Sequence, residues 1–138
     1  MADILLVVDD LFFLAKIQAT AKLTGVPVEG VPISTLQDTL AKGPSEGPSQ
    51  RSIRGVIIDL NHRSGSAVNL IRGLKSSPVT AAVPVVGFLS HVQGDLAEAA
   101  RAAGCDVVLA RSAFAQQLPD LLRKLTEVGT AKARGTEA

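Results

Sequence analysis

The sequence predicts an α/β protein: a doubly wound (βα)5 three-layer sandwich whose parallel sheet has the strand order 2-1-3-4-5. Two runs of Val, Leu and Ile, at 4–8 and 56–58, are apolar throughout, which is typical of strands buried on both faces of a parallel sheet. Strand-like runs alternate along the chain with segments of helical periodicity. Both runs end abruptly in carboxylates, at Asp9-Asp10 and at Asp59. Because ligands of open α/β sheets lie just beyond such strand ends, these residues are the first candidates for a site.

The first half of the chain predicts two strand–helix units. A strand over residues 4–8 leads into a helix over 11–23, which Gly25 terminates. The apolar positions of this helix, at helical spacing, are Leu14, Ile17 and Ala21. A short strand follows at 27–32, and Ser34 with Gln37 forms a capping box that opens the next helix. The Gly-, Pro- and Ser-rich segment 43–52 is expected to be a loop within a single domain.

The second half predicts three further strands, ending at Asp59, Leu89 and Ala110, each followed by a helix. The last helix is expected to carry Pro119 in its first turn. The inward-facing residues of the three helices are, in chain order, Ala67, Leu70, Ile71 and Leu74; Leu96, Ala99, Ala100 and Ala103; and Leu118, Leu121, Leu122 and Leu125. After Glu127 the chain is polar, so we expect one domain over 1–127 and a disordered tail over 128–138.

Composition excludes several functional classes. A chain of 138 residues with 46 % hydrophobic residues is long enough for one domain with a real core. Its 14 basic residues are scattered and the net charge is +1, which argues against nucleic acid as a partner. No apolar run reaches the ~18 residues of a membrane helix, and no signal pattern opens the chain, so we expect a cytoplasmic protein with no membrane contact. The single cysteine, Cys105, is expected to be a small buried residue rather than a reactive thiol.

The predicted strand order brings three carboxylates together. It places the first and third strands side by side, so Asp9, Asp10 and Asp59 converge on one edge of the sheet. Clustered carboxylates repel one another, and their pocket therefore favours protons or a hard cation. Mg²⁺ suits such a pocket because it takes oxygen ligands and keeps several waters. A carboxylate beside Mg²⁺ can accept a phosphoryl group, since the metal neutralises charge on the transferring oxygens.

At this point the chain resembles a CheY-like response-regulator receiver domain over about residues 3–127. The segments that carry the resemblance are 5–10, 56–59 and 104–106, in the family's order and spacing. The resemblance implies a flavodoxin-like fold and a signalling role in a two-component or phosphorelay system rather than an enzyme. It also implies that Asp59 is the phospho-acceptor. Mg²⁺, bound weakly, would be held by Asp9, Asp10, Asp59 and the backbone carbonyl of Asn61.

The departures from the family pattern concern the residues that sense phosphate. Leu89 stands where receivers carry Thr or Ser, and Ser90, one place later, is expected to point to the opposite side of the strand. Arg111 replaces the family's Lys, which is not a conservative exchange because its guanidinium is a planar fork on a longer stem. Val108 replaces the aromatic residue that turns inward on activation. The chain therefore resembles an atypical receiver or pseudo-receiver.

Each candidate residue also has a structural interpretation. Asp9 and Asp10 can simply cap the first helix, and Arg111 can neutralise the acidic pocket as well as bind phosphate. His62 and His91 are expected to be loop residues rather than ligands. Of Phe12 and Phe13, one is expected to pack inward and the other to be exposed as a partner contact.

Other functions remain open alternatives. A phosphorylation-independent interaction module on the same fold is the strongest. A haloacid-dehalogenase-type phosphatase needs Asp-x-Asp, and a cobalamin-binding module needs Asp-x-His-x-x-Gly; neither spacing is present at Asp9 or Asp59. The sequence stays within one domain, so we expect output through a partner: a sensor histidine kinase or another signalling protein, with a homodimer left open.

Overall fold

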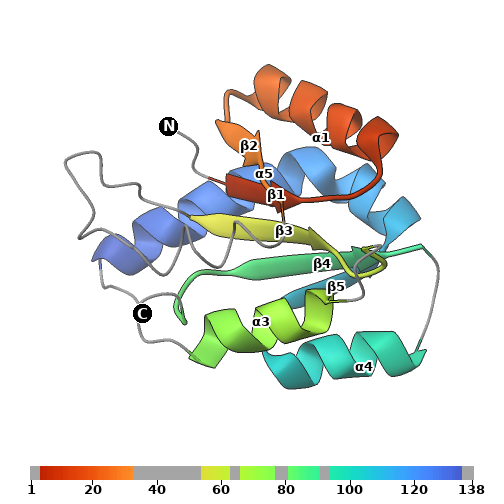
Figure 1. Ribbon diagram of the computed structural model, residues 1–138. Coiled ribbons are helices and arrows are strands. Elements are labelled where there is room, and N and C mark those ends of the chain that lie inside the picture. The colour runs from red at the N-terminus through yellow and green to blue at the C-terminus, as the bar shows by residue number, and fades with distance from the viewer. Residues whose placement is uncertain (1–3, 33–53, 63–65, 77–80, 91–93, 135–138) are drawn as a thin grey trace.

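The computed structural model describes residues 4–32, 54–62, 66–76, 81–90 and 94–134, with side chains in the last helix described as far as Leu125. The sheet has five strands in the order β2-β1-β3-β4-β5, all parallel (Figure 1). The predicted architecture and strand order are therefore confirmed. The helix expected after Ser34 and the loop at 43–52 lie outside the described residues.

Three central strands are buried along their whole length. They are β1 (Ile4–Val7), β3 (Gly55–Asp59) and β4 (Val85–Leu89), and the edges are formed by β2 (Val28–Gly30) and β5 (Val107–Ala110). Leu6 is in register with Ile57, and Asp59 with Phe88. Since parallel strands in register end at the same edge, the residues after β1, β3 and β4 meet there.

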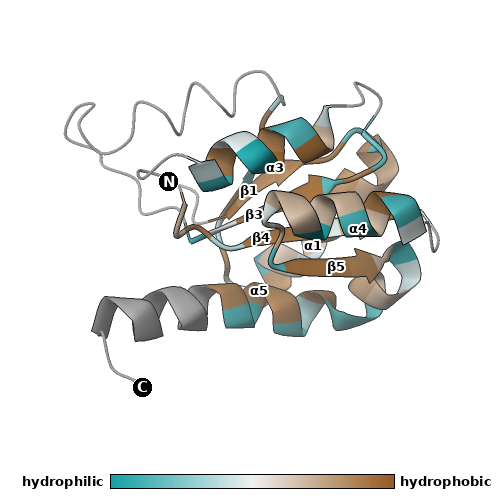
Figure 2. Ribbon diagram, turned by 90° about the horizontal axis from the view of Figure 1, so that it is seen from below, coloured by the Kyte–Doolittle hydropathy of each residue, from teal (hydrophilic) through white to brown (hydrophobic). Residues whose placement is uncertain are grey.

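The helices form two layers. α3 (Ala67–Ser76) and α4 (Gly94–Ala103) pack on one face of the sheet, while α1 (Leu11–Thr24) and α5 (Arg111–Arg134) pack on the other (Figure 1). Alternate strand residues face the two layers, as the pleat requires: Leu5 and Val7 face α3 and α4, whereas Ile4 and Leu6 face α1 and α5. In Figure 2 the central strands are mostly brown, whereas the helices mix brown and teal, as expected for elements with one face in water.

The predicted inner face of α3 is confirmed, because its four apolar residues are all buried: Ala67, Leu70, Ile71 and Leu74. In α1 the buried residues are Phe13, Ile17 and Ala21, while Leu14 is only half buried. Phe13 therefore packs inward and Phe12 is exposed, which confirms the expected division between the two rings.

The prediction for the start of the last helix was wrong. α5 begins at Arg111, directly after β5, so Pro119 lies inside the helix rather than in its first turn. Phe114 and Leu118 are fully buried on the core side of this extra segment. Their burial stabilises the helix despite the backbone hydrogen bond that Pro119 cannot donate. The helix also continues to Arg134, past the expected end at Glu127.

Candidate functional site

An acidic pocket of about 560 Å³ lies at the carboxyl edge of the sheet. It is lined by Asp9, Asp10, Leu11, Phe12, Asp59, Asn61, Ser90 and Arg111. The predicted metal-binding and phosphate-binding residues are among these eight: Asp9, Asp10, Asp59, Asn61 and Arg111. The segments that bring them together are those following β1, β3 and β4 and the first turn of α5, which is the arrangement that the strand order predicts.

Asp59 is the buried member of the pocket. It is the last residue of β3 and only 3 % exposed. Burial raises the pKa of its carboxyl, and the charge of Asp9 acts in the same direction. The backbone N–H of Asn61, which donates to Asp59 Oδ1 at 2.9 Å, and the nearby Arg111 and His62 oppose that rise in pKa. A buried carboxyl with a perturbed pKa in a pocket marks a candidate reactive group.

Both carboxylate oxygens of Asp10 have structural partners. Its Oδ1 accepts hydrogen bonds from the backbone N–H groups of Phe12 and Phe13, at 3.0 and 3.2 Å, which makes it the N-cap of α1. Its Oδ2 lies 3.5 Å from Arg111 Nη1, in an ion pair between two side chains that are each about one-third exposed. The capping interpretation therefore holds for Asp10, and its remaining oxygen faces a cation that belongs to the protein itself.

Arg111 is held over aromatic rings. Its guanidinium carbon is 5.0 Å from the centre of the Phe13 ring and 5.9 Å from that of Phe88. Such a position favours a cation, because the ring face carries negative potential. The salt bridge that the sequence analysis considered is present, and its partner is Asp10.

The aromatic cluster beneath Arg111 was missed by sequence reasoning. The ring centres of Phe13, Phe88 and Phe114 are 4.7 to 5.8 Å apart. Three of the chain's four Phe residues thus form one cluster under the pocket. Two features of the sequence could have indicated this cluster: the chain has few aromatic residues, and Phe88 lies one residue before the end of β4.

Asn61 joins the loops that follow β3 and β4. Its Oδ1 accepts hydrogen bonds from the backbone N–H of Ser90, at 2.6 Å, and from the Ser90 hydroxyl, at 3.0 Å. Leu89 is buried in the core on the α3 and α4 side, at 2 % exposure. The side chain of Ser90 points to the other side of the strand from that of Leu89. Its hydroxyl nevertheless lies at the acidic pocket rather than away from it.

The carboxylates share a pocket without forming a metal-ligand cluster. Among the residues that the structure describes, no three His, Cys, Asp or Glu side chains are grouped to hold a metal ion. Both oxygens of Asp10 have partners within the protein, namely the α1 amides and Arg111. The donors themselves, carboxylate and amide oxygens, are of the kind that a hard cation prefers. His91 lies outside the described residues.

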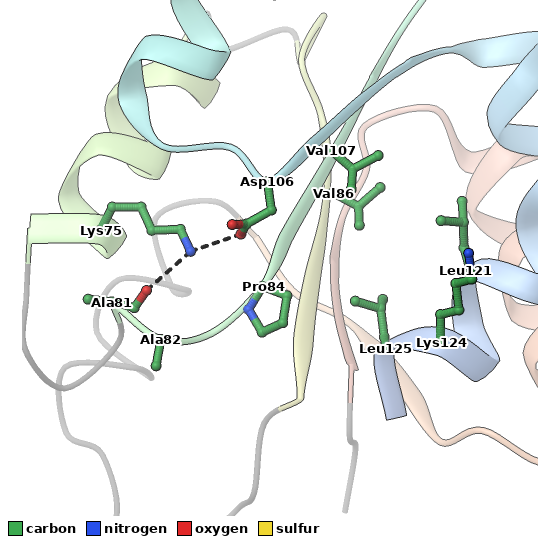
Figure 3. A pocket seen from close by; sticks show the side chains of 10 residues that line it. All are labelled: Lys75, Ala81, Ala82, Pro84, Val86, Asp106, Val107, Leu121, Lys124 and Leu125. Atoms are coloured by element: carbon green, nitrogen blue, oxygen red, sulfur yellow. Dashed lines mark hydrogen bonds and ion pairs between the residues drawn. The ribbon is translucent and has the colours of Figure 1, made fainter. Parts of the chain in front are cut away.

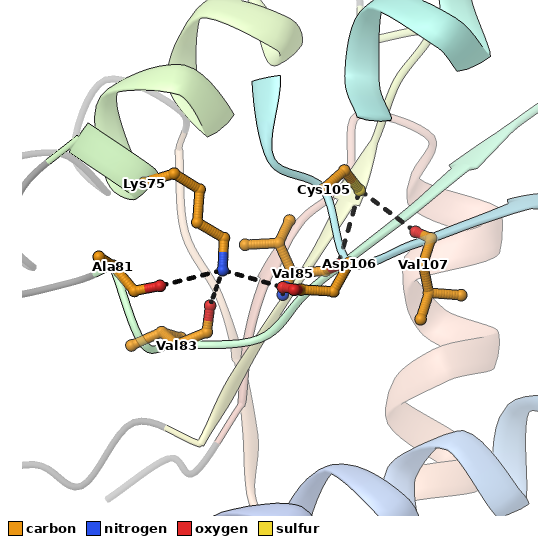
Figure 4. Close-up of polar contacts among 7 residues, drawn as sticks. All are labelled: Lys75, Ala81, Val83, Val85, Cys105, Asp106 and Val107. Atoms are coloured by element: carbon orange, nitrogen blue, oxygen red, sulfur yellow. Dashed lines mark hydrogen bonds and ion pairs between the residues drawn. The ribbon is translucent and has the colours of Figure 1, made fainter. Parts of the chain in front are cut away.

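A second polar cluster lies at the opposite end of the sheet. Lys75 Nζ, on α3, donates to Asp106 Oδ2 at 2.9 Å and to the carbonyls of Val83 and Ala81 at 2.8 and 3.2 Å (Figure 4). Asp106 Oδ2 also accepts from the backbone N–H of Val85 at 2.7 Å. Three acceptors match the three N–H bonds of an ammonium. Lys75 therefore fastens α3 to the starts of β4 and β5, and sequence reasoning missed this contact.

The residues around the Lys75–Asp106 cluster have a structural role rather than a reactive one. A pocket of about 320 Å³ opens beside it, with the Lys75–Asp106 pair on one side and the apolar side chains of Val107, Leu121 and Leu125 on the other (Figure 3). Cys105, next to Asp106 (Figure 4), is buried, and burial raises the pKa of its thiol to about 11. A thiol with such a pKa is protonated at neutral pH and therefore a poor nucleophile.

No protein-family model matches the sequence, and comparison with curated proteins gives no significant match. Solved structures do match. A response regulator from Hahella chejuensis has a TM-score of 0.75 and 16 % identity over 94 % of this chain and 98 % of its own. The phosphorylated cyanobacterial phytochrome response regulator RcpA has a TM-score of 0.71 and 20 % identity, with 94 % of each chain covered. The Mn²⁺-bound form of another response regulator has a TM-score of 0.68 and 19 % identity over 88 % of this chain and 89 % of its own.

These similarities establish the fold. The chain has the CheY-like fold of response-regulator receiver domains, with a pocket of carboxylates at the edge of the sheet where ligands of such folds lie. In the part of the chain that the structure describes, no helix is both long and apolar enough to cross a membrane.

Proposed function

We propose that this protein is a receiver-like signalling protein of a two-component or phosphorelay system, with Asp59 as its phospho-acceptor. The observation that carries the proposal is the buried carboxylate of Asp59, placed at a strand end together with Asp9 and Asp10 in one pocket of a receiver-type fold. A lone buried carboxylate is costly to desolvate, so its presence there calls for a role.

The chemistry would be transfer of a phosphoryl group to a carboxylate oxygen. One oxygen of ionised Asp59 forms the new bond to phosphorus, and the donor's leaving group departs with the electron pair of the bond that breaks. Asp9, Asp10, Asp59 and the Asn61 carbonyl would hold Mg²⁺. Bound there, the cation would neutralise charge on the phosphoryl oxygens that approach the carboxylate. The Mn²⁺-bound response regulator of the same fold supports a divalent cation as the guest.

Arg111 changes the electrostatics of the pocket. Its positive charge already faces Asp10 and helps to keep Asp59 ionised. It would therefore compete electrostatically with a divalent cation, and we propose that metal binding is weak for this reason. The same guanidinium offers N–H donors to phosphoryl oxygens, in place of the ammonium expected at this position.

The residues that would transmit a change in the pocket to the rest of the surface are replaced. Leu89 is buried and has no hydroxyl, and Val108 has no ring to reorient. A bound group shifts a conformational equilibrium only through its differential contacts with the two states. These two residues favour the second candidate function, a protein-interaction module on the same fold that works without phosphorylation. In either case the partner would be a sensor histidine kinase or another signalling protein, in the cytoplasm.

Intact-mass spectrometry after incubation with acetyl phosphate and Mg²⁺ tests the proposal. We expect wild-type protein to gain one phosphoryl mass and Asp59→Asn to gain none. Asp120→Asn is the matched control, because Asp120 is an exposed aspartate on α5, outside the acidic pocket. No adduct on wild type, or an adduct that persists in Asp59→Asn, would leave the interaction module as the better account.

A further inference from the structure

The pocket beside the Lys75–Asp106 cluster is a second concave site, at the edge of the sheet opposite the acidic pocket (Figure 3). Its volume of about 320 Å³ lies within the range of small-molecule sites in proteins, about 300–1,000 Å³. Seven of the ten residues that line it are apolar. A concave and mostly apolar surface with a few polar groups is typical of a ligand site.

The apolar wall of this pocket comes from three elements. Val86 of β4 and Val107 of β5 lie beside Leu121 and Leu125 of α5 (Figure 3). Val86, Leu121 and Leu125 are at most 9 % exposed and belong to the core between the sheet and α5. Because closely packed core residues keep their positions, the wall is fixed by the fold and does not need a ligand to form.

Three charged residues line the pocket, and two of them neutralise each other. Lys75 Nζ lies 2.9 Å from Asp106 Oδ2, and its other hydrogen bonds go to backbone carbonyls. Lys124 is exposed, and none of the residues that the structure describes forms an ion pair with it. Figure 3 shows it on the side of the pocket opposite the Lys75–Asp106 pair. The pocket therefore carries one net positive charge, at Lys124.

The lining selects the chemistry of the occupant. None of the ten lining residues carries a hydroxyl, a side-chain amide or an aromatic ring, so a sugar or a nucleobase would find few partners there. A ligand with an ammonium group would meet the charge of Lys124, whereas a carboxylate would pair with it. At about 30 Å³ for a group the size of water, the volume fits a molecule of roughly ten non-hydrogen atoms.

We propose that this pocket binds a small apolar monocarboxylate, with its apolar chain against Val86, Leu121 and Leu125 and its carboxylate at Lys124. The chain's single thiol, Cys105, is buried and does not line the pocket, so the occupant would be bound rather than modified. This inference goes beyond the proposed function, because the pocket shares no residue with the Asp59 site.

Amide NMR titration of the unphosphorylated protein with octanoate tests the proposal. We expect octanoate to shift the amides of 85–86, 106–107 and 121–125, with a dissociation constant of roughly a millimolar or below, as for a ligand of about ten non-hydrogen atoms. Octylammonium, which has the same chain and the opposite charge, should bind about fivefold more weakly or worse, the ratio of one exposed ion pair. Butyrate, which keeps the charge and shortens the chain, should bind roughly tenfold more weakly or worse.

Variants locate the two ends of the ligand. Lys124→Glu should weaken octanoate binding about fivefold and reverse the preference between octanoate and octylammonium. Arg123→Glu is the matched control: it makes the same charge change at the neighbouring exposed position of α5, which does not line the pocket, and should alter affinity less than about twofold. Val107→Phe adds a ring at the half-buried wall and should weaken octanoate binding roughly tenfold or more by filling the pocket. Amide spectra of the free variants verify that each one folds.

Three results would overturn the proposal. The first is the absence of shifts at about 10 mM octanoate, well above the expected dissociation constant. The second is equal affinity for octanoate and octylammonium, or an equal effect of Lys124→Glu and Arg123→Glu. The third is a set of shifts confined to 11–24, because octanoate would then bind the exposed apolar side chains of α1 instead of the pocket. Repeating the titration with Asp59→Asn separates this test from the proposed function: octanoate binding should be unchanged, whether or not Asp59 accepts phosphate.

Discussion

Replacing Arg111 by Gln should move two properties of the protein in opposite directions. The structure gives Arg111 an ion pair with Asp10 at 3.5 Å and a position 5.0 Å from the centre of the Phe13 ring. A partly exposed ion pair contributes up to about 1 kcal/mol, and a cation–π contact about 0.5–1 kcal/mol. The free energy of unfolding should therefore fall by about 1–2 kcal/mol, which lowers the melting temperature by roughly 5 °C in a chain of this size.

Metal affinity should rise in the same variant. A unit positive charge within several ångströms of a divalent ion in a water-like dielectric costs about 1–2 kcal/mol, and its removal corresponds to roughly tenfold tighter binding. The loss of Arg111 also frees Asp10 Oδ2 from its ion pair. Calorimetric titration with Mn²⁺ measures the affinity, and thermal melting measures the stability of the same samples.

Arg123→Gln is the control, since Arg123 lies on the same helix and pairs with Asp120 at the surface, with both side chains more than half exposed. It should change stability by less than about 0.5 kcal/mol and leave metal affinity unaltered. Metal binding that is unchanged or weaker in Arg111→Gln would refute the claim that Arg111 competes with the cation. Unchanged stability would show that the contacts of Arg111 with Phe13 and Asp10 make no net contribution to the free energy of unfolding.

Three further substitutions test the polar cluster at the opposite end of the sheet and the acidic pocket itself. Lys75→Met should lower the free energy of unfolding by about 2–3 kcal/mol, because Asp106 loses a charged partner at a lysine that is only 17 % exposed. The exposed Lys124→Met should change it by less than about 0.5 kcal/mol, and urea denaturation would reveal any reversal of that order. Gly104→Ala should cost about 1–3 kcal/mol, since φ is +110° and the added Cβ would lie 2.6 Å from Lys75 Cγ. A melting temperature equal to that of wild type would contradict this. Asp59→Asn should stabilise the protein at pH 7. Because the pKa of Asp59 is raised in the folded state, the folded protein binds this proton more tightly than the unfolded chain does. The stability of the wild type therefore falls as the pH rises from the unfolded-state pKa of Asp59 through its folded-state pKa. The advantage of the variant should fade as the pH falls toward the ordinary Asp pKa of about 3.9, and an advantage that grows on acidification would show the opposite shift.

Local sequence patterns were sufficient for the architecture. Apolar runs that end in carboxylates identified β1 and β3, and the alternation of strands and helices gave the sheet order. That order alone placed Asp9, Asp10 and Asp59 at one edge, because parallel strands share an end. The helical spacing of α3 likewise identified its buried face.

What the sequence did not reveal depends on contacts between distant segments. The sequence analysis expected Arg111 to pair with the acidic pocket but did not identify Asp10, 101 positions away, as its partner, and no local pattern relates Lys75 to Asp106, 31 positions away. The start of α5 was missed for a related reason. Pro119 is a strong local signal for a first helical turn, but burial of Phe114 against Phe88 and Phe13 extends the helix back to Arg111. Tertiary packing outweighed the local signal.

The central claim is that the acidic pocket accepts a phosphoryl group at Asp59 while the rest of the fold responds little. Amide NMR spectra with and without beryllofluoride, a phosphoryl mimic, in the presence of Mg²⁺ test both halves. We expect large shifts after Asp10, at 60–62 after Asp59, and at Ser90, with little change elsewhere. We expect the shifts to stay near the pocket because the buried Leu89 has no hydroxyl to donate to a phosphoryl oxygen. One such charge-assisted hydrogen bond would contribute about 1.5–3 kcal/mol toward a change of conformation. An unchanged spectrum at these amides would contradict the proposed site, and large shifts along 96–103 and 118–125 would contradict the reduced switch.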